Sequence, residues 1–249
     1  MSATTEGTTD RLRLILGDEG LDLLQRSRVM VLGLGGVGSS CAEALARGGV
    51  GSLVLVDRDV VTPSNINRQA LAFQSTIGRP KAEVMAQMVA DINPACATLP
   101  VQAFIDKDRV AKQLGALPRP DYVVDAIDTI SQKLAIAAWC QQAGIPEVSA
   151  MGGANKLDPS RLRFAPIEKT TVDPLARIVR KECRKRGIKG LVALYSDEQP
   201  REAEGKRDAI DEHGFVREGQ SILGTMSYFP PIMGQMLAGY VIRALTGLL

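Results

Sequence analysis

The chain is poor in the residues that carry metal, redox and proton-transfer chemistry. Its 249 residues include one histidine and four cysteines, and no two cysteines form a Cys-x-x-Cys pair. The spacings of zinc sites and of dithiol redox motifs are therefore missing, so we expect no structural zinc and the reduced thiols of a cytoplasmic protein. The single histidine, His213, stands in a polar, charged stretch, which leaves a dehydrogenase without an obvious proton-transfer residue.

The chain also lacks a strong net charge and an uninterrupted apolar segment. Its net charge is only +2, so any contact with nucleic acid must depend on a local basic patch. The most apolar segment, 222–249, is interrupted by Pro230, Pro231, Gln235 and Arg243. These interruptions favour a packed core helix over a membrane-spanning one, and a peripheral contact with a membrane stays open.

A glycine-rich turn, 33–38, separates a strand-like apolar run from an alanine-rich helical segment. A second apolar run ends at Asp57, 19 residues after Gly38. This order predicts a nucleotide phosphate at the helix N-terminus, glycines that allow close backbone approach, and a carboxylate placed for a ribose hydroxyl. A hydride-transferring dinucleotide enzyme and an ATP-using enzyme fit this pattern equally well.

Strand-like and helix-like segments alternate along the first 150 residues. They predict an α/β fold with a doubly wound, mainly parallel sheet of Rossmann-like type and helices on both faces. We expect residues 1–249 to form a single domain, with a flexible tail at 1–10, a mobile loop at 196–220 and an apolar helix at 222–249. The expected strands are 29–32, 53–56, 98–103, 122–124, 147–149, 161–167 and 191–195, and the expected helices are 36–47, 78–92, 106–114, 131–143 and 173–186.

Polar residues that follow these strands distinguish the two nucleotide chemistries. Arg68 lies in a polar stretch after the second strand, and it could neutralise charge on the β- and γ-phosphates as pyrophosphate leaves. Lys81 opens the next helix, and Asp128 follows the fourth strand, where a carboxylate oxygen suits Mg²⁺. Taken singly, they could be a surface ion pair, a solvated helix residue and a helix N-cap. Together they favour ATP that is cut at its α-phosphate.

The combined motifs resemble the ThiF/MoeB/HesA superfamily of adenylating enzymes, which are related to ubiquitin-activating enzymes. The resemblance implies a homodimeric α/β domain that binds ATP and Mg²⁺ and adenylates a carboxylate. It places Arg68, Lys81 and Asp128 in catalysis, with Arg68 reaching across a dimer and Asp128 as the metal ligand. The nucleotide contacts that we expect are Gly33, Gly35, Gly36, Gly38, Asp57, Asp59, Ser64, Asn65, Asn67, Arg68, Gln69, Lys81, Asp128 and Thr129.

The missing cysteine pairs indicate one branch of this superfamily. Sulfur-carrier activators usually have two Cys-x-x-Cys zinc pairs and a later nucleophilic cysteine, whereas the segment 190–196 contains no cysteine. The chain resembles instead the enzymes that dehydrate threonylcarbamoyladenosine in tRNA. That resemblance implies an ATP-dependent dehydratase that adenylates the threonyl carboxylate and promotes its cyclisation, with a sulfur-relay protein as a further partner.

Three alternatives remain at this point. The chain could activate the C-terminal glycine of a small ubiquitin-like sulfur carrier, transfer a hydride, or bind ATP without catalysis. Cys183 bears on the first of them, because flanking cations would lower the pKa of its thiol and permit reactivity. A buried structural role for Cys183 is nevertheless favoured.

The helix expected at 173–186 is strongly basic. Five of its cationic residues fall within an arc of about 140° when drawn at 100° per residue, whereas Ile178, Val179 and Cys183 face the other way. Such a face could contact tRNA phosphates or could simply be solvated. The candidate nucleic-acid contacts are Arg177, Arg180, Lys181, Arg184 and Lys185.

Overall fold

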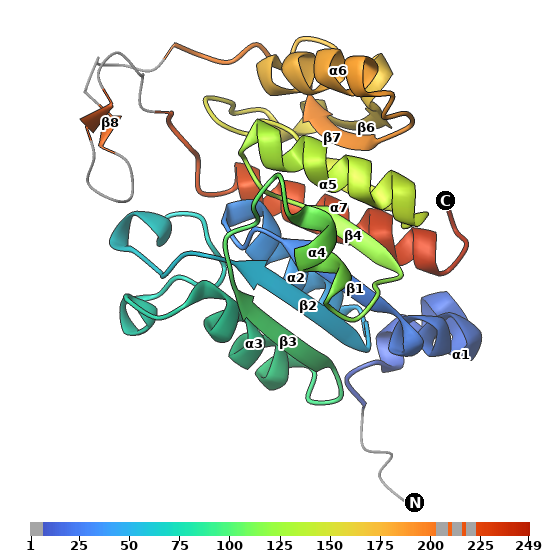
Figure 1. Ribbon diagram of the computed structural model, residues 1–249. Helices are drawn as coiled ribbons and strands as arrows, with labels where there is room; N and C mark the ends of the chain where they lie inside the picture. The colour runs from blue at the N-terminus through green and yellow to red at the C-terminus, as the bar shows by residue number, and fades with distance from the viewer. Residues whose placement is uncertain (1–6, 203–208, 211–215, 218–222) are drawn as a thin grey trace, which may run out of the picture.

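The computed structural model describes residues 7–202, 209–210, 216–217 and 223–249. They form a seven-stranded sheet with the order β3-β2-β1-β4-β5-β7-β6, in which β6 alone runs antiparallel to its neighbour (Figure 1). A second pair, β8 and β9, is a short antiparallel ladder. The strands are β1 Arg28–Leu32, β2 Ser52–Asp57, β3 Ala97–Gln102, β4 Tyr122–Asp125, β5 Glu147–Ala150, β6 Leu162–Pro166, β7 Val192–Ser196, β8 Ala209–Ile210 and β9 Val216–Arg217.

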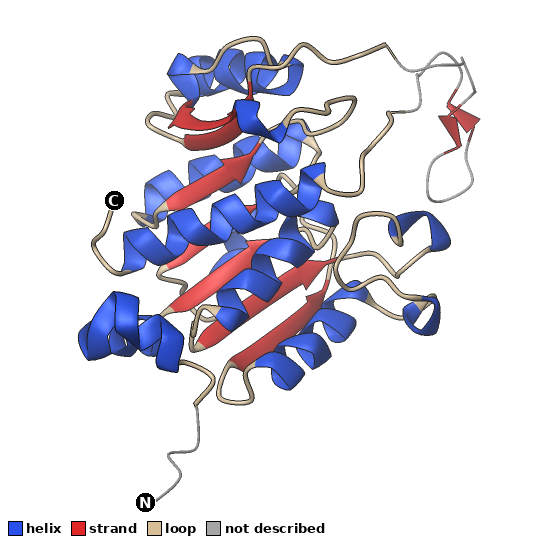
Figure 2. Ribbon diagram, turned by 180° about the vertical axis from the view of Figure 1, so that it is seen from behind, coloured by secondary structure: helices blue, strands red, loops and turns tan. Residues whose placement is uncertain are grey.

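Helices cover both faces of the large sheet (Figure 2). Side chains alternate along a strand, so Val29 and Val31 of β1 pack with α2, α3 and α7, whereas Met30 and Leu32 pack with α4 and α5 on the other face. Burial on both faces explains why the strand reads as one continuous apolar run, and the predicted doubly wound sheet is confirmed. The helices are α1 Asp10–Arg26, α2 Gly36–Arg47, α3 Lys81–Ile92, α4 Val110–Gly115, α5 Ile130–Ala143, α6 Pro174–Arg186 and α7 Phe229–Leu245.

The apolar C-terminal segment forms α7, which packs against α2 in the core. A Cβ on Gly234 would lie only 2.3 Å from the carbonyl oxygen of Val37, so the two helices can cross this closely only with glycine at that position. Phe229, Met233 and Leu237 are fully buried at the same contact. Across the described residues, no helix is both long and apolar enough to cross a membrane.

Helix α1 was not predicted from the sequence. Leu14 and Ile15, at 87% and 83% exposure, lie on its outer side, so its apolar residues do not form one stripe. Gly17 also has a φ of 68° within the helix, where it produces a kink. Residues 1–6 of the predicted tail, most of the predicted loop at 196–220 and His213 lie outside the described residues.

Glu147, at the start of β5, is a buried carboxyl group beside other charged side chains. Its Oε1 atom has no hydrogen-bond partner among the described residues. Burial raises the pKa of Glu147 well above the ordinary 4.5, and the neighbouring Asp125 carboxylate raises it further against the opposing charge of Lys133. At a pH between the unfolded and the folded pKa, Glu147 is therefore protonated in the folded protein and ionised in the unfolded chain.

We expect the free energy of unfolding to fall as the pH rises from the unfolded pKa of Glu147 toward its higher folded pKa. The folded state binds more protons than the unfolded state in this window, which gives stability a negative slope against pH. The variant Glu147→Gln stays neutral, so its stability should decline less across this window in urea unfolding experiments. Equal slopes for the two proteins would contradict the raised pKa.

Candidate active site

A cavity of about 720 Å³ opens at the carboxyl ends of the parallel strands. It lies where the strand order reverses beside β1, which is the position at which open α/β sheets bind ligands. The glycine turn, the ends of β2 and β4, the first residue of α3 and the segment after β5 all contribute to its lining. Segments that are distant in sequence therefore meet around one volume.

The glycine turn packs so tightly that side chains are excluded from it. Gly33 has a φ of 84°, and a Cβ on Gly38 would lie 1.8 Å from the carbonyl oxygen of Gly33. Gly36 begins α2 against Arg68 and Pro230, where a Cβ would lie 2.8 Å from the Pro230 side chain. No described side chain caps α2, so its first N–H groups can receive an anion.

Asp57, at the end of β2, braces the glycine turn. One carboxylate oxygen accepts a hydrogen bond from the Leu34 N–H at 2.5 Å, and the other accepts one from the Asp59 N–H at 2.8 Å. Burial raises the pKa of Asp57, and the charge of Lys81 opposes that shift. Asp57 thus joins the turn to β2 in addition to lining the cavity.

Lys81 and Asp59 form an ion pair in the wall of the cavity. The Lys81 side chain is only 4% exposed, and its Nζ lies 3.1 Å from Oδ2 of Asp59. Its position at the first residue of α3 adds an ammonium to a helix N-terminus. This combination attracts anions, although Lys81 must share its charge with Asp59.

Arg68 is held at the cavity by oxygen atoms of its own turn. Its guanidinium donates to the Ser64 carbonyl at 3.0 Å and to Oδ1 of Asn67 at 2.8 Å. Asn65 is buried nearby, and its Oδ1 accepts from the Thr62 N–H at 3.1 Å, which fixes the start of the turn.

Most of the predicted nucleotide contacts come together around the cavity. Three of them are placed elsewhere: Gly38 packs on Gly33, the Ser64 hydroxyl lies beside that of Thr62, and Asn67 donates to the Thr225 carbonyl. The predicted contacts that line the cavity are Gly33, Gly35, Gly36, Asp57, Asp59, Asn65, Arg68, Gln69, Lys81, Asp128 and Thr129.

The last residue of β4, Asp125, and the nearby Asp128 carry carboxylates in different environments. Asp125 is fully buried, with Oδ2 2.8 Å from Nζ of Lys133 and 2.7 Å from the Ser149 hydroxyl. Asp128 is exposed and lines the cavity, and α5 has Thr129 rather than Asp128 as its N-cap. No cluster of three metal-ligating side chains occurs in the described part of the chain. Asp128 could therefore hold Mg²⁺ only together with other oxygen ligands, such as phosphate and water.

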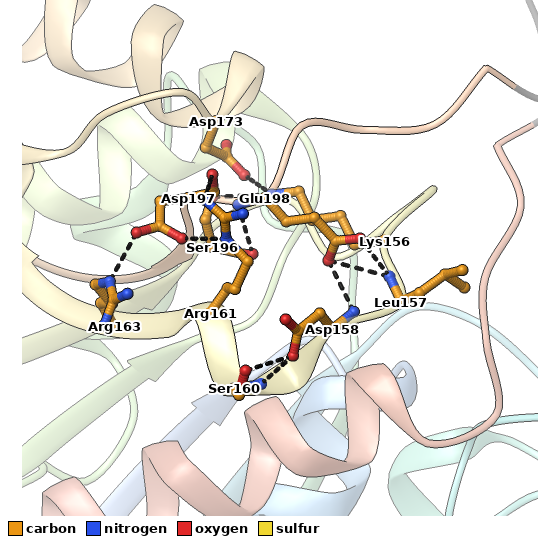
Figure 3. A network of polar contacts seen from close by, with 10 residues as sticks. All are labelled: Lys156, Leu157, Asp158, Ser160, Arg161, Arg163, Asp173, Ser196, Asp197 and Glu198. Carbon is orange, nitrogen blue, oxygen red and sulfur yellow. Dashed lines mark hydrogen bonds and ion pairs between the residues drawn. The ribbon is translucent and has the colours of Figure 1, made fainter.

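Two further parts of the cavity lining contain residues that no sequence motif predicts. The Arg58 guanidinium lies 5.3 Å from the ring centroid of Phe104, and with Gln132 they form a wall suited to a flat aromatic group. Lys156 and Asp173 form a buried ion pair in another part of the lining (Figure 3). Phe104 and Lys156 lie in no recognisable sequence motif. Asp173 could have been noticed, because it lies at the predicted start of a helix.

The basic helix α6 is oriented differently from the predicted arc. Its buried side consists of Ala176, Val179 and Cys183, whereas Ile178 is 42% exposed, so the predicted inward orientation of Ile178 is wrong. The reason is that Ala176 replaces Ile178 in the buried stripe, which follows three- and four-residue spacing. Arg180 is half-buried and donates to the Thr170 carbonyl and hydroxyl.

The remaining predicted cations, Arg177, Lys181, Arg184 and Lys185, are exposed. Lys185 also pairs with Glu182 at 2.7 Å. Burial raises the pKa of Cys183 to about 11 and outweighs the lowering by the Arg186 charge, which agrees with the structural role favoured for this cysteine. The thiol is therefore protonated at neutral pH and is not an activated nucleophile.

The family model described as the ThiF family matches residues 9–248. The chain belongs to the ThiF family. It is 42% identical over 241 residues to the tRNA threonylcarbamoyladenosine dehydratase of Bacillus subtilis, a match that covers 94% of this chain and 93% of that protein. The fold also matches the crystal structure of Escherichia coli tRNA N6-threonylcarbamoyladenosine dehydratase, TcdA, in complex with ATP. The TM-score is 0.80 at 29% identity, covering 97% of this chain and 98% of that one.

A relative with a different name is matched over a shorter length. The molybdopterin-synthase adenylyltransferase of E. coli is 37% identical over 131 residues, which is 53% of this chain and 51% of that protein. The B. subtilis dehydratase is thus matched over 94% of this chain, and this adenylyltransferase over 53% of it.

Proposed function

We propose that this ThiF-family chain is an ATP-dependent dehydratase that acts on threonylcarbamoyladenosine in tRNA. It adenylates the threonyl carboxylate and promotes its cyclisation. The observation that carries the proposal is the cavity at the reversal point of the sheet, where Arg68, Lys81 and Asp128 lie around the glycine turn. The same function is supported by a dehydratase that is matched over 93% of its length and by a relative whose structure was solved with ATP.

The proposed chemistry has two steps. A carboxylate oxygen of the substrate attacks the α-phosphorus, the bond to the bridging oxygen breaks, and pyrophosphate leaves with that bond's electrons. The carbamoyl group of the same substrate then attacks the acyl carbon, so that AMP leaves, a ring forms and a proton is released. Because the substrate supplies this nucleophile itself, the protonated and buried state of Cys183 is no obstacle.

The lining residues divide this work among them. We assign Asp57 to a ribose hydroxyl and the N-terminus of α2 to the phosphates, because both line the cavity. Arg68 offsets charge on the leaving pyrophosphate, and Lys81 does so near the α-phosphate. Asp128 would hold Mg²⁺ together with phosphate oxygens, and that ion supplies further neutralisation of phosphate charge.

The wider expectations are part of the same proposal. We expect one domain over residues 1–249, a cytoplasmic homodimer, and a sulfur-relay protein as a further partner, and a peripheral membrane contact of 222–249 stays a prediction. The exposed Leu14 and Ile15 of α1 are apolar side chains that a second copy of the chain could cover.

The identity of the substrate distinguishes this function from the alternative, the activation of a small ubiquitin-like sulfur carrier. Purified protein should release AMP and pyrophosphate from ATP when it receives tRNA that carries threonylcarbamoyladenosine. Unmodified tRNA and a carrier peptide that ends in Gly-Gly serve as controls. Turnover with the peptide instead of the tRNA would show a sulfur-carrier activator, and mass spectrometry of tRNA nucleosides from a deletion strain should show loss of the cyclic form.

The exposed cations of α6 are expected to contact tRNA phosphates. We expect the double variant Lys181→Glu/Arg184→Glu to raise KM for tRNA about tenfold or more. The slope of log KM against the logarithm of the salt concentration should fall by about two. The reason is that two counterion-releasing contacts are lost and replaced by repulsion. Steady-state kinetics at several salt concentrations measure both effects.

A matched control for α6 is Lys112→Glu on α4, which changes an exposed lysine on a different helix. It should leave KM and the salt slope unchanged. The double variant changes the net charge by −4 and the control by −2, so effects in that ratio would mean that only the net charge of the protein matters, and the α6 surface would then have no specific role.

A further inference from the structure

Asn155 connects two stretches of chain that are far from it in sequence. Its carbonyl accepts a hydrogen bond from the Arg201 N–H at 2.8 Å, and its N–H donates to the Gly224 carbonyl at 2.8 Å. Its side-chain Oδ1 accepts a third from the Gly224 N–H at 2.7 Å. One residue therefore fixes the chain at 201 and at 224 relative to the segment after β5.

The backbone of Asn155 has a conformation that few residue types adopt readily. Its φ is 58°, and Val172 is the one other described non-glycine residue with a positive φ. Asparagine and aspartate tolerate this left-handed region better than other residues with a side chain. In this conformation the main chain and the side chain of Asn155 both reach Gly224, so the strain serves a specific set of contacts.

The neighbouring residue Lys156 fixes the chain segment that carries Asn155. The Lys156 ammonium contacts Asp173 and donates to the Ser196 carbonyl at 3.3 Å (Figure 3). It also donates to the Gly152 carbonyl at 2.9 Å. An ammonium has three N–H donors, so these three acceptors occupy it fully. Lys156 thus anchors the segment to α6 and β7 and has no donor left for a substrate.

The stretches that Asn155 holds are part of the cavity lining. Pro200, Leu223 and Thr225 line it together with Asn155 itself. The Thr225 carbonyl accepts from Nδ2 of Asn67 at 3.1 Å, and Asn67 in turn accepts from Arg68. A chain of hydrogen bonds therefore connects Arg68, on the side of the cavity that we assign to phosphate, with Thr225, in the wall that Asn155 holds.

We propose that Asn155 is a positioning residue for the tRNA-borne acyl group, an inference that rests on the proposed function. It holds the wall made by Pro200, Leu223 and Thr225 at a fixed distance from Arg68, so that the threonyl carboxylate meets the α-phosphate. Asn155 does this through Gly224 and Arg201 and needs no contact with the reacting atoms. Its loss should therefore impair the use of tRNA much more than the binding of ATP.

Two substitutions separate the side-chain hydrogen bond from the backbone conformation. Asn155→Gly keeps the left-handed backbone and both main-chain hydrogen bonds but removes the Oδ1 acceptor. Asn155→Asp keeps the acceptor and tolerates the same φ. Ser160→Ala is the matched control, because the Ser160 hydroxyl bonds only to Asp158 among the described side chains, on the same loop.

The kinetic experiment compares ATP affinity with use of the modified tRNA. We expect Asn155→Gly to lower kcat/KM for tRNA about fivefold or more, the factor that corresponds to one hydrogen bond, with ATP affinity unchanged within about twofold. Asn155→Asp should restore most of the loss, and Ser160→Ala should behave like the wild type. Wild-type kinetics for Asn155→Gly, or equal losses in the Gly and Asp variants, would overturn the proposal.

Amide hydrogen exchange tests the same assignment without turnover. In Asn155→Gly the Gly224 amide should lose protection about fivefold or more, because its acceptor is gone, whereas the Arg201 amide should keep its acceptor. Unchanged protection at Gly224 would refute the positioning role even if the chain acts on tRNA. Wild-type protein that never uses modified tRNA would refute the proposed function, and the exchange result would still decide whether Asn155 holds this wall.

Discussion

Replacing Arg68 by alanine is expected to lower turnover about 100- to 1,000-fold while ATP affinity changes only a few-fold. The positive charge of Arg68 matters most when negative charge accumulates on the departing pyrophosphate, so its loss raises the barrier more than it weakens the ground state. The guanidinium is already oriented at the cavity by the Ser64 carbonyl and by Asn67. Little of its effect should therefore come from reorganisation.

The Arg68 prediction is checked by pyrophosphate release under saturating ATP, with ATP affinity measured separately by thermal shift. Arg68→Lys is the matched variant, because it keeps the charge but loses the planar fork that bonds Ser64 and Asn67. It should lie between the wild type and Arg68→Ala. A large loss of ATP affinity with normal turnover would show that Arg68 binds the ground state instead.

The parts of the fold that follow from local pattern were predictable. Continuous apolar runs indicated the central strands, and α2 spans the predicted residues 36–47 because the glycine turn and Arg47 mark its ends. Lys81 is the first residue of α3, as predicted, whereas the expected segment 78–92 begins three residues early, because Gly78 has a φ of 83° and Pro80 is the N-cap. Helix α1 was missed because its exposed apolar side chains hide the periodicity.

The site was predictable only where its residues follow strands of the sheet. Arg68, Lys81 and Asp128 could be placed together because the carboxyl ends of parallel strands meet at one edge. Asn155 and Lys156 could not, because Asn155 depends on partners at 201 and 224, and Lys156 depends on partners at the end of β7 and at the N-cap of α6. Long-range contacts of this kind leave no periodic signal in the sequence.

Replacing Lys133 by methionine is expected to lower the free energy of unfolding by about 3–5 kcal/mol. Lys133 is 1% exposed and its partner Asp125 is 0% exposed, so the substitution leaves a carboxylate buried without its counter-ion. The Ser149 hydroxyl, which also donates to Asp125, cannot replace a full positive charge. Urea unfolding measures the loss, and the exposed Lys112→Met on α4 should change stability by no more than about 0.5 kcal/mol.

The double variant Lys133→Met/Asp125→Asn separates the cost of the unpaired charge from the cost of a cavity. Neutralising both partners removes the buried charge, so most of the lost stability should return. The amide oxygen that Asp125→Asn introduces can still accept from the Ile127 N–H, as the Asp125 carboxylate does at 3.0 Å, so the loop that carries Asp128 should keep its shape. Additive losses in the double variant would mean that packing of the lysine stem, and not its charge, stabilises this end of β4.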